Sequence, residues 1–208
     1  MKNLAIIGSG DLGQLIAYHS TTSYTVVGYI DDFAEKDSFV ENLPILGTVN
    51  DIEELYQNSI FDELIIAIGY KHFDLRARLY NQFSKNIPFA TIIHPSSVID
   101  SSCKIGSGVF VLPGVVVDRK VVIQDNVLLN VGVTIAHDSF IGKHSFISPS
   151  VAIAGFVNIG EKCNIGINTT VIDNVTITSN VQTGGGTVVI NDLTLAGLYV
   201  GNPSRFIK

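Results

Sequence analysis

The second half of the chain carries an apolar side chain at every sixth position. Counting in sixes from Ile93 to Leu195 gives eighteen positions, and all but Thr183 are aliphatic. Apolar positions recur about every 3.6 residues in an α-helix and at every second residue in a strand, so neither element explains this period. A period of six is typical of a parallel β-helix, in which each repeat is a short strand followed by a corner. Three repeats would complete one coil, so residues eighteen apart should stack.

Small or β-branched residues also recur in the same stretch. Most of the aliphatic positions are followed four residues later by such a residue, as at Val109, Val127 and Cys163. We expect the aliphatic side chains to point inward and the small residues to fit at the crowded corners. Because one repeat cannot bury its own apolar face, about six coils must stack to form a continuous core.

The chain before this stretch has the pattern of a small α/β domain. Apolar runs predict buried parallel strands, helical patterns alternate with them, and a Pro-containing segment is expected to be a connecting loop. The expected strands cover residues 4–8, 25–30, 63–69 and 89–92. One helix is expected after the glycine loop, through His19, and two more over residues 51–57 and 73–85, while the loop covers 43–47. The sequence therefore predicts an α/β domain over residues 1–92 and an all-β domain over residues 93–208.

A glycine-rich loop follows the first predicted strand. Residues 8–13 read Gly-Ser-Gly-Asp-Leu-Gly, and Asp31 and Asp32 follow about twenty residues later, where a dinucleotide-binding fold places a ribose-binding carboxylate. The α/β region is only about half of such a fold, and nothing downstream resembles a hydride-transfer domain. Two interpretations stay open: the loop binds a nucleotide, or its glycines only permit a tight turn. Gly69 lies at the carboxyl end of another predicted strand, where ligands of open α/β sheets bind.

Charge and composition narrow the function classes. The net charge of −6 argues against a nucleic-acid partner, which would require a basic surface. The first apolar run is too short for a signal peptide or a membrane span. Cys103 and Cys163 are sixty residues apart, not a multiple of eighteen, so we expect neither a disulfide nor a metal site. A cytoplasmic protein is the expectation.

One of the five histidines stands out as a possible general base. A histidine pKa near 6.5 suits proton abstraction from a nucleophile at neutral pH. His137 lies two residues after the inward Ile135, so it should lie outside the core near a corner, and Asp138 follows it directly. Contact between adjacent side chains requires corner geometry, because they face opposite ways along a strand. The others are expected on the first helix (His19), after the third strand (His72), in the linker (His94) and on an outward, solvated or interface corner (His144).

The whole chain resembles the NeuD/PglD-type sugar acyltransferases. The resemblance rests on the glycine loop with Asp31-Asp32, the junction Ile93-His94-Pro95-Ser96, the six-residue repeats and the ending Val200-Gly201-Asn202-Pro203-Ser204-Arg205. It implies a half-Rossmann-like N-terminal domain, a left-handed β-helix, a homotrimer without membrane insertion, and acetyl-CoA as co-substrate without a metal. The implied substrate is a nucleotide-linked amino sugar.

The resemblance also suggests individual site residues. It implies His137 as base, assisted by Asp138, with the acyl donor held along successive coils. The implied nucleotide-sugar residues are Ser9, Gly10, Asp11, Leu12, Asp31, Asp32 and Gly69, and the implied coenzyme residues are Asn130, Phe146, Gly155, Ile167 and Gly185. Two positions depart from the family. Phe146 stands where some relatives have a second histidine, and Leu12 replaces a histidine of some amino-sugar enzymes.

The expected reaction is therefore N-acetylation of a nucleotide-linked 4-amino-4,6-dideoxy sugar for a surface polysaccharide such as lipopolysaccharide O-antigen. The amine would attack the thioester directly, without an acyl-enzyme. One alternative is O-acetylation of a sialic acid, and another is a non-catalytic β-helix that binds a ligand and assembles. The identity of the nucleotide, the sugar stereochemistry and the acyl chain stay open.

Overall fold

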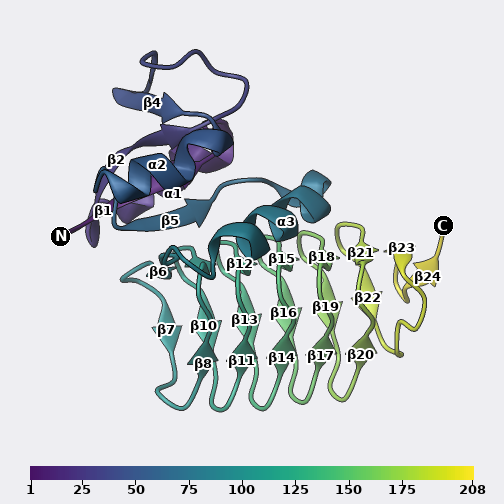
Figure 1. The fold of residues 1–208 in the computed structure, drawn as a ribbon. Coiled ribbons are helices and arrows are strands. Elements are labelled where there is room, and N and C mark those ends of the chain that lie inside the picture. Colours follow the sequence, from purple (N-terminus) through teal and green to yellow (C-terminus); the bar gives the residue numbers. More distant parts are fainter. The chain divides into compact units, whose positions relative to one another are not determined.

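The chain divides into two compact units. The computed structural model describes residues 1–208, and its units are Met1–Ile92 and Ile93–Lys208. Both are drawn in Figure 1. None of the helices has the length and apolar character needed to cross a bilayer.

The N-terminal unit is built on a five-stranded sheet in the order β3-β4-β2-β1-β5. All neighbours are parallel except β3 and β4. The buried run Leu4–Ile7 places β1 at the centre of the core. The strands are β1 (Lys2–Ile7), β2 (Tyr24–Ile30), β3 (Phe39–Val40), β4 (Leu43–Gly47) and β5 (Glu63–Ile66), and the helices are α1 (Asp11–Ser20), α2 (Ile52–Gln57) and α3 (Phe73–Phe83). Short 3₁₀ turns cover Val49–Asp51 and Tyr70–His72.

The prediction of a connecting loop over residues 43–47 is wrong, because this segment is strand β4. Proline cannot donate a ladder hydrogen bond, which weighs against a strand. Pro44 avoids this cost because β4 pairs with β2 only from Ile45 onward. The Ile45 amide then donates to the Ser38 carbonyl at 2.8 Å.

The predicted fourth strand over residues 89–92 is also wrong. Phe89 forms only an isolated bridge to Leu64, and Ile92 already belongs to β6 (Ile92–Ile93) of the β-helix sheets. The strand it would extend, β5, has only four residues, so it offers little edge for a longer partner.

The C-terminal unit is a left-handed parallel β-helix. Its short strands form three sheets of six, five and eight strands, and the six-stranded sheet is the row β7 to β22 in Figure 1. Val116 pairs with Thr134 and Thr134 with Ala152, so residues eighteen apart stack as predicted. The strands after β6 are β7 (Val98–Ile99), β8 (Lys104–Ile105), β9 (Phe110–Val111), β10 (Val116–Val117), β11 (Val122–Ile123), β12 (Leu128–Leu129), β13 (Thr134–Ile135), β14 (Phe140–Ile141), β15 (Phe146–Ile147), β16 (Ala152–Ile153), β17 (Asn158–Ile159), β18 (Asn164–Ile165), β19 (Thr170–Val171), β20 (Thr176–Ile177), β21 (Val181–Thr183), β22 (Val188–Val189), β23 (Gly197–Val200) and β24 (Arg205–Phe206).

The positions predicted to point inward are buried in the middle coils of the β-helix but not at its two ends. Ile93 is 40% exposed and Leu195 is 58% exposed, so neither is the core residue that the period predicts. Near the C-terminus the chain leaves the period, because Leu193 rather than Leu195 pairs with Ile177 and is buried. The end of the column is completed by Tyr199 from β23.

Thr183, the polar exception among the inward positions, has its hydroxyl satisfied inside the prism. Its Oγ1 accepts from the Gly166 amide at 2.8 Å and shares a 2.9 Å hydrogen bond with Thr169 Oγ1. A buried hydroxyl without such partners would cost about 1–3 kcal/mol. The two threonines therefore compensate each other within adjacent coils.

The corners of the β-helix share one backbone conformation. A residue with positive φ, between 55° and 73°, recurs every six residues. Asparagine and glycine tolerate this left-handed region best, and they occupy most of these positions. The residues are Gly108, Gly114, Lys120, Asn126, Gly132, Asp138, His144, Ser150, Phe156, Lys162, Asn168, Asn174, Asn180 and Gly186.

Candidate active site

The His137 and Asp138 side chains form a hydrogen-bonded pair. His137 Nδ1 lies 3.0 Å from Asp138 Oδ2, and the side chains are 36% and 26% exposed. A carboxylate accepts but cannot donate when ionised, so Nδ1 carries the proton toward Asp138. This leaves Nε2 of a neutral imidazole as a proton acceptor. The pair therefore has the arrangement of an oriented general base.

Corner geometry produces this contact. Asp138 has φ of 56°, which turns its side chain out of the strand alternation toward the preceding imidazole. Backbone hydrogen bonds to both neighbouring coils hold the corner: the Asp138 amide donates to the Arg119 carbonyl, and the Phe156 amide donates to the His137 carbonyl, both at 3.1 Å. The prediction that His137 and Asp138 can touch only at a corner of the β-helix is therefore consistent with the structure, which places both residues at one.

Gly155 and Phe156 of the next coil bound the imidazole. A Cβ on Gly155 would lie 2.8 Å from His137 Cε1 and 3.0 Å from Nε2, so only glycine leaves room for the ring in this position. The Phe156 ring lies edge-on to the imidazole, with centroids 5.2 Å apart and planes at 87°. Sequence reasoning missed Phe156, although it is eighteen residues after Asp138 and therefore stacks on it.

The other histidines have different surroundings. The expectation of a solvated His144 is wrong: it is 3% exposed, and its Nδ1 lies 3.0 Å from Asn126 Nδ2 on the preceding coil. His94 Nδ1 lies 2.8 Å from Ser96 Oγ in the linker, and His19 is near the end of α1.

The predicted site residues of the β-helix fall on two different corners. His137, Asp138 and Gly155 lie between the six-stranded and five-stranded sheets, following β13 and β16. The other corner, between the eight-stranded and six-stranded sheets, carries Asn130, Ile167 and Gly185 after β12, β18 and β21.

Ile167 and Gly185 stack one above the other, as their spacing predicts. A Cβ on Gly185 would lie 3.0 Å from Ile167 Cγ2, and the Gly186 amide donates to the Ile167 carbonyl at 2.8 Å. Ile167 is half exposed, and Asn130 Oδ1 accepts from the Val131 amide at 2.8 Å. Phe146 is not on this corner but within β15, where its side chain is buried.

In the N-terminal unit, Asp31 closes the glycine loop. Its Oδ2 accepts from the Ser9 amide at 2.8 Å and from Ser9 Oγ at 2.7 Å, and its Oδ1 accepts from the Phe33 amide at 2.9 Å. Burial opposes ionisation of Asp31, but these hydrogen bonds outweigh it and lower the pKa of its carboxyl. Asp31 therefore remains ionised and organises the loop.

Asp32 is the more available carboxylate of the two. Its side chain is exposed, and only Oδ1 accepts a protein hydrogen bond, from the Val49 amide at 2.8 Å. The free Oδ2 can accept from a ligand. Asp11 and Leu12 begin α1 directly after the loop.

The glycines of the loop differ in what they do for the protein. A Cβ on Gly13 would lie 2.1 Å from the Gly8 carbonyl oxygen, so the turn itself requires this glycine. A Cβ on Gly10 or on Gly69 would meet nothing within 4 Å, and neither residue has positive φ. The turn therefore requires Gly13, whereas Gly10 and Gly69 leave open space beside their backbone, and nucleotide binding by the loop stays a prediction.

Comparison with known proteins agrees with the geometry of both units. Residues 3–83 match the family model described as the PglD N-terminal domain. A histidine-to-alanine variant of GDP-perosamine N-acetyltransferase from Caulobacter crescentus, solved with CoA and GDP-perosamine, is 28% identical with a TM-score of 0.94, covering 100% of this chain and 98% of that one. Over its whole length the chain is therefore similar to sugar acyltransferases of the NeuD/PglD type.

Further members of this fold group extend the comparison. The acetyltransferase domain of PglB from Neisseria gonorrhoeae, in complex with acetyl coenzyme A, is 26% identical with a TM-score of 0.89 and 99% of each chain covered. WeeI from Acinetobacter baumannii, 18% identical with a TM-score of 0.85 and 100% of each chain covered, shares the fold. No curated protein matches the chain significantly in sequence.

Proposed function

We propose that this acyltransferase uses acetyl-CoA to N-acetylate the amino group of a nucleotide-linked amino-dideoxy sugar. The observation that carries the proposal is the His137–Asp138 pair, whose Nδ1–Oδ2 distance is 3.0 Å and whose ring lies over Gly155. Relatives 28% and 26% identical to the chain hold CoA with GDP-perosamine, and acetyl coenzyme A. The product would serve surface polysaccharide synthesis, such as that of lipopolysaccharide O-antigen.

The chemical step is a direct transfer. The sugar nitrogen attacks the thioester carbonyl carbon, the C–N bond forms, and the C–S bond breaks to release CoA. His137 Nε2 takes the proton that the nitrogen loses, and Asp138 stabilises the imidazolium through Nδ1. The hydrogen bond to Asp138 fixes the tautomer and the orientation of the ring, as a carboxylate does for a catalytic histidine.

The nucleotide belongs at the carboxyl ends of β1, β2 and β5. Gly10 and Gly69 have no steric need to be glycine, which is explained if a ligand approaches their backbone. The Ser9 amide is taken by Asp31, so the amides of Gly10, Asp11 and Leu12 at the start of α1 would bind a phosphate, as helix N-termini do. Asp32 would accept from a base or ribose, while Asp31 holds the loop in place.

The acyl donor would run along the corner that carries Asn130, Ile167 and Gly185. An exposed Ile167 with a glycine stacked on it provides a narrow apolar edge for a pantetheine arm. In one chain this corner differs from the His137 corner, because the six-stranded sheet separates them. Two chains side by side would bring the two corners together. Phe146 is proposed as a flanking apolar residue, which cannot polarise the acyl carbonyl as a histidine would.

We expect the protein to be a homotrimer with one site between each pair of subunits. The exposed apolar side chains Val98, Val116, Ile167 and Ile172 on the β-helix would then be covered. Analytical ultracentrifugation at micromolar concentration should give three times the chain mass of 22.4 kDa. A monomer that still turns over would contradict a site shared between subunits.

Replacing Gly155 with alanine should lower kcat without preventing folding. The new Cβ would collide with the imidazole, so the ring must leave its rotamer at a cost of about 0.5–1.5 kcal/mol. We expect kcat to fall by up to about tenfold. The control is the same substitution in a His137→Ala background, where it should have no further effect. An additional loss there would mean that Gly155 acts independently of His137.

Thiol release distinguishes this function from its alternatives. The protein is incubated with acetyl-CoA and a set of nucleotide-linked amino sugars, sialic acid or neither, and free CoA is measured. Release with an amino-sugar nucleotide alone supports the proposal. Release with sialic acid alone supports the O-acetyltransferase, and no release with any acceptor supports the non-catalytic scaffold.

A further inference from the structure

Phe156 is the apolar exception in a column of stacked corner residues. Four residues spaced by eighteen share φ of 56–60°: Lys120, Asp138, Phe156 and Asn174. Backbone hydrogen bonds join their coils, as in the 3.1 Å bond from the Phe156 amide to the His137 carbonyl. The other three residues carry polar or charged side chains. Phe156 therefore places an aromatic ring where the rest of this column carries polar groups.

The backbone conformation of Phe156 is unfavourable for its side chain. Its φ of 59° lies in the left-handed region, which bulky side chains rarely adopt. Asn174, at the same place on the next coil, is of a type that tolerates this region. Strain of this kind persists only where the surrounding structure holds it, and it is concentrated at functional sites. The phenylalanine therefore requires an explanation other than local preference.

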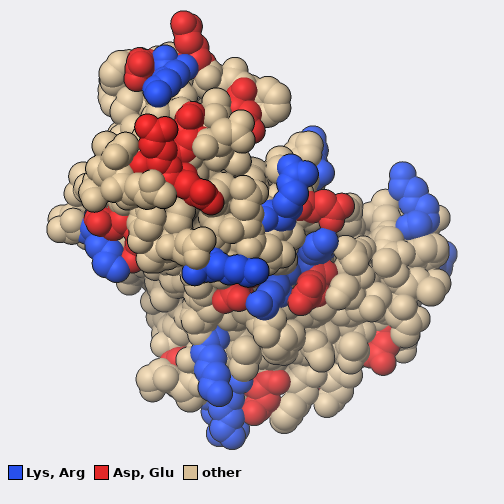
Figure 2. Space-filling view, in the orientation of Figure 1, with Lys and Arg blue, Asp and Glu red and all other residues tan.

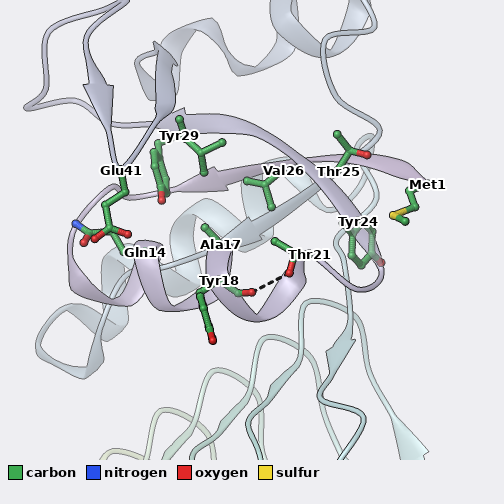
Figure 3. A pocket seen from close by; sticks show the side chains of 11 residues that line it. Met1, Gln14, Ala17, Tyr18, Thr21, Tyr24, Thr25, Val26, Tyr29 and Glu41 are labelled. Atoms are coloured by element: carbon green, nitrogen blue, oxygen red, sulfur yellow. Dashed lines mark hydrogen bonds between the residues drawn. The ribbon is translucent and has the colours of Figure 1, made fainter.

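Core packing does not provide that explanation. An aromatic residue that does serve the core is Tyr29, which is 0% exposed and whose ring leaves β2 toward α1 (Figure 3). A Cβ on Gly13 of α1 would lie 3.4 Å from Tyr29 Cε1, so this ring fits closely against the helix. Phe156 is instead 56% exposed, and its ring contacts the His137 imidazole at a centroid distance of 5.2 Å. The Phe156 ring is therefore accessible beside the proposed general base.

An acceptor bound at His137 comes within reach of this ring. A nitrogen hydrogen-bonded to Nε2 would lie about 2.7–3.2 Å from it. Because the Phe156 and His137 rings are adjacent, groups attached one or two bonds from that nitrogen can contact the Phe156 ring. Gly155 has no side chain to stand between them, and a Cβ there would already lie 3.0 Å from Nε2. Phe156 is therefore the side chain of this coil that is placed to meet the acceptor.

The coil that carries Phe156 offers no polar side chain at this corner. Ala154, Gly155 and Phe156 follow one another there. The next coil carries Asp173 and Asn174, whose side chains hydrogen-bond each other at 2.7 Å. Uncharged residues also make up most of the β-helix surface visible in Figure 2. A methyl group placed against the Phe156 coil would be buried favourably, whereas a hydroxyl would lose water without gaining a side-chain partner.

We propose that Phe156 selects a 6-deoxy acceptor by packing its ring against the C6 methyl group, an inference that rests on the function proposed above. In a 4-amino-4,6-dideoxy sugar the nitrogen is attached to C4, and the neighbouring C5 carries the methyl group. With the nitrogen at His137 Nε2, the methyl group is therefore among the groups nearest to the Phe156 ring. The ring offers apolar contact area to a methyl group and no hydrogen-bonding atom to a hydroxyl. Phe156 thus determines specificity, while His137 and Asp138 perform the proton transfer.

Two acceptors that differ only at C6 test the proposal. They are the amino-sugar nucleotide with the fastest thiol release in the experiment above and its analogue that keeps the 6-hydroxyl, on the same nucleotide. The unmodified protein should prefer the 6-deoxy acceptor by about tenfold or more in kcat/KM. Equal kcat/KM values would overturn the role of Phe156 and leave the N-acetyltransferase assignment intact. No release with either acceptor would overturn both.

Variants of Phe156 separate sugar contact from a structural use. Phe156→Asn should reduce the preference to about threefold or less, mainly through a higher KM for the 6-deoxy acceptor, whereas Phe156→Tyr keeps the ring and should preserve it. The thermal midpoint of Phe156→Asn should stay the same or rise, because asparagine tolerates a φ of 59°. Lys120→Asn is the matched control, since Lys120 has the same φ on the same corner, and it should leave the preference unchanged.

Three results with Phe156→Asn would each show that the proposal is wrong. An equal fall of kcat with both acceptors would mean that the ring acts only on the imidazole. A loss of assembly in sedimentation with an unchanged preference would mean that the ring packs against a second copy of the chain. A lower thermal midpoint with an unchanged preference would mean that the ring serves only the fold.

Discussion

Replacing His137 with alanine should lower kcat by about 10²- to 10⁴-fold, the usual contribution of a general base. The imidazole is the proposed proton acceptor, and no other histidine shares its corner of the β-helix. Coenzyme affinity should change little, because the proposed coenzyme corner is carried by other residues. Steady-state kinetics with saturating acetyl-CoA and direct titration of CoA measure the two quantities separately.

Two further variants define the contribution of the pair. Asp138→Asn should cost less than His137→Ala, because the ring remains and loses only its ionised partner at 3.0 Å. His19→Ala removes an imidazole from the end of α1 and should leave kcat unchanged. Turnover of His137→Ala close to the unmodified rate would mean that the base lies elsewhere or that the amine arrives already deprotonated.

The six-residue period was sufficient to predict the β-helix, because inward packing repeats identically in every middle coil. It could not predict the ends. An inward position is buried only if another coil covers it, and Ile93 and Leu195 lack that cover. Near the C-terminus, Leu193 and Tyr199 complete the core from outside the period. What covers the last coil depends on where the chain turns back, which no repeat encodes.

The coil-to-coil placement of the candidate site residues was predictable, whereas their side-chain contacts were not. The spacing of eighteen identified Gly155 below His137, but the same spacing also leads to Phe156, which sequence reasoning did not use. Corner residues with positive φ face different surroundings according to the neighbouring coil. Asp138 meets an imidazole in its own corner, whereas His144 is buried against Asn126. These differences arise from tertiary packing rather than from the local pattern.

In the N-terminal unit, the two adjacent acids looked equivalent in sequence and are not. Both carboxylate oxygens of Asp31 accept hydrogen bonds, from Ser9 and from the Phe33 amide. In Asp32 only Oδ1 accepts one, so Oδ2 is free. The pattern located both at the end of β2, but only the geometry separates a residue that holds the loop from one that can accept from a ligand. Their substitutions should therefore have different consequences.

Replacing Asp32 with alanine should raise the KM of the nucleotide-linked sugar by about 10- to 150-fold. A hydrogen bond to a charged group is worth about 1.5–3 kcal/mol once a bound ligand excludes water from it. The acetyl-CoA parameters should barely change, because the proposed coenzyme corner belongs to the β-helix. Thermal stability should also change little, since Asp32 is exposed and accepts only the Val49 amide.

Asp31→Ala is the informative comparison, because it should raise the same KM and also lower the thermal midpoint. Removing this carboxylate leaves Ser9 and Phe33 without their acceptor, so the glycine loop loses its closure. Two adjacent acids would repel a free acidic sugar such as sialic acid but suit a base or ribose edge whose phosphates lie at the loop amides. The decisive measurement is therefore the KM for the acceptor in both variants. If Asp32→Ala leaves it unchanged, the nucleotide-binding proposal for this edge fails and sialic acid O-acetylation becomes the better assignment.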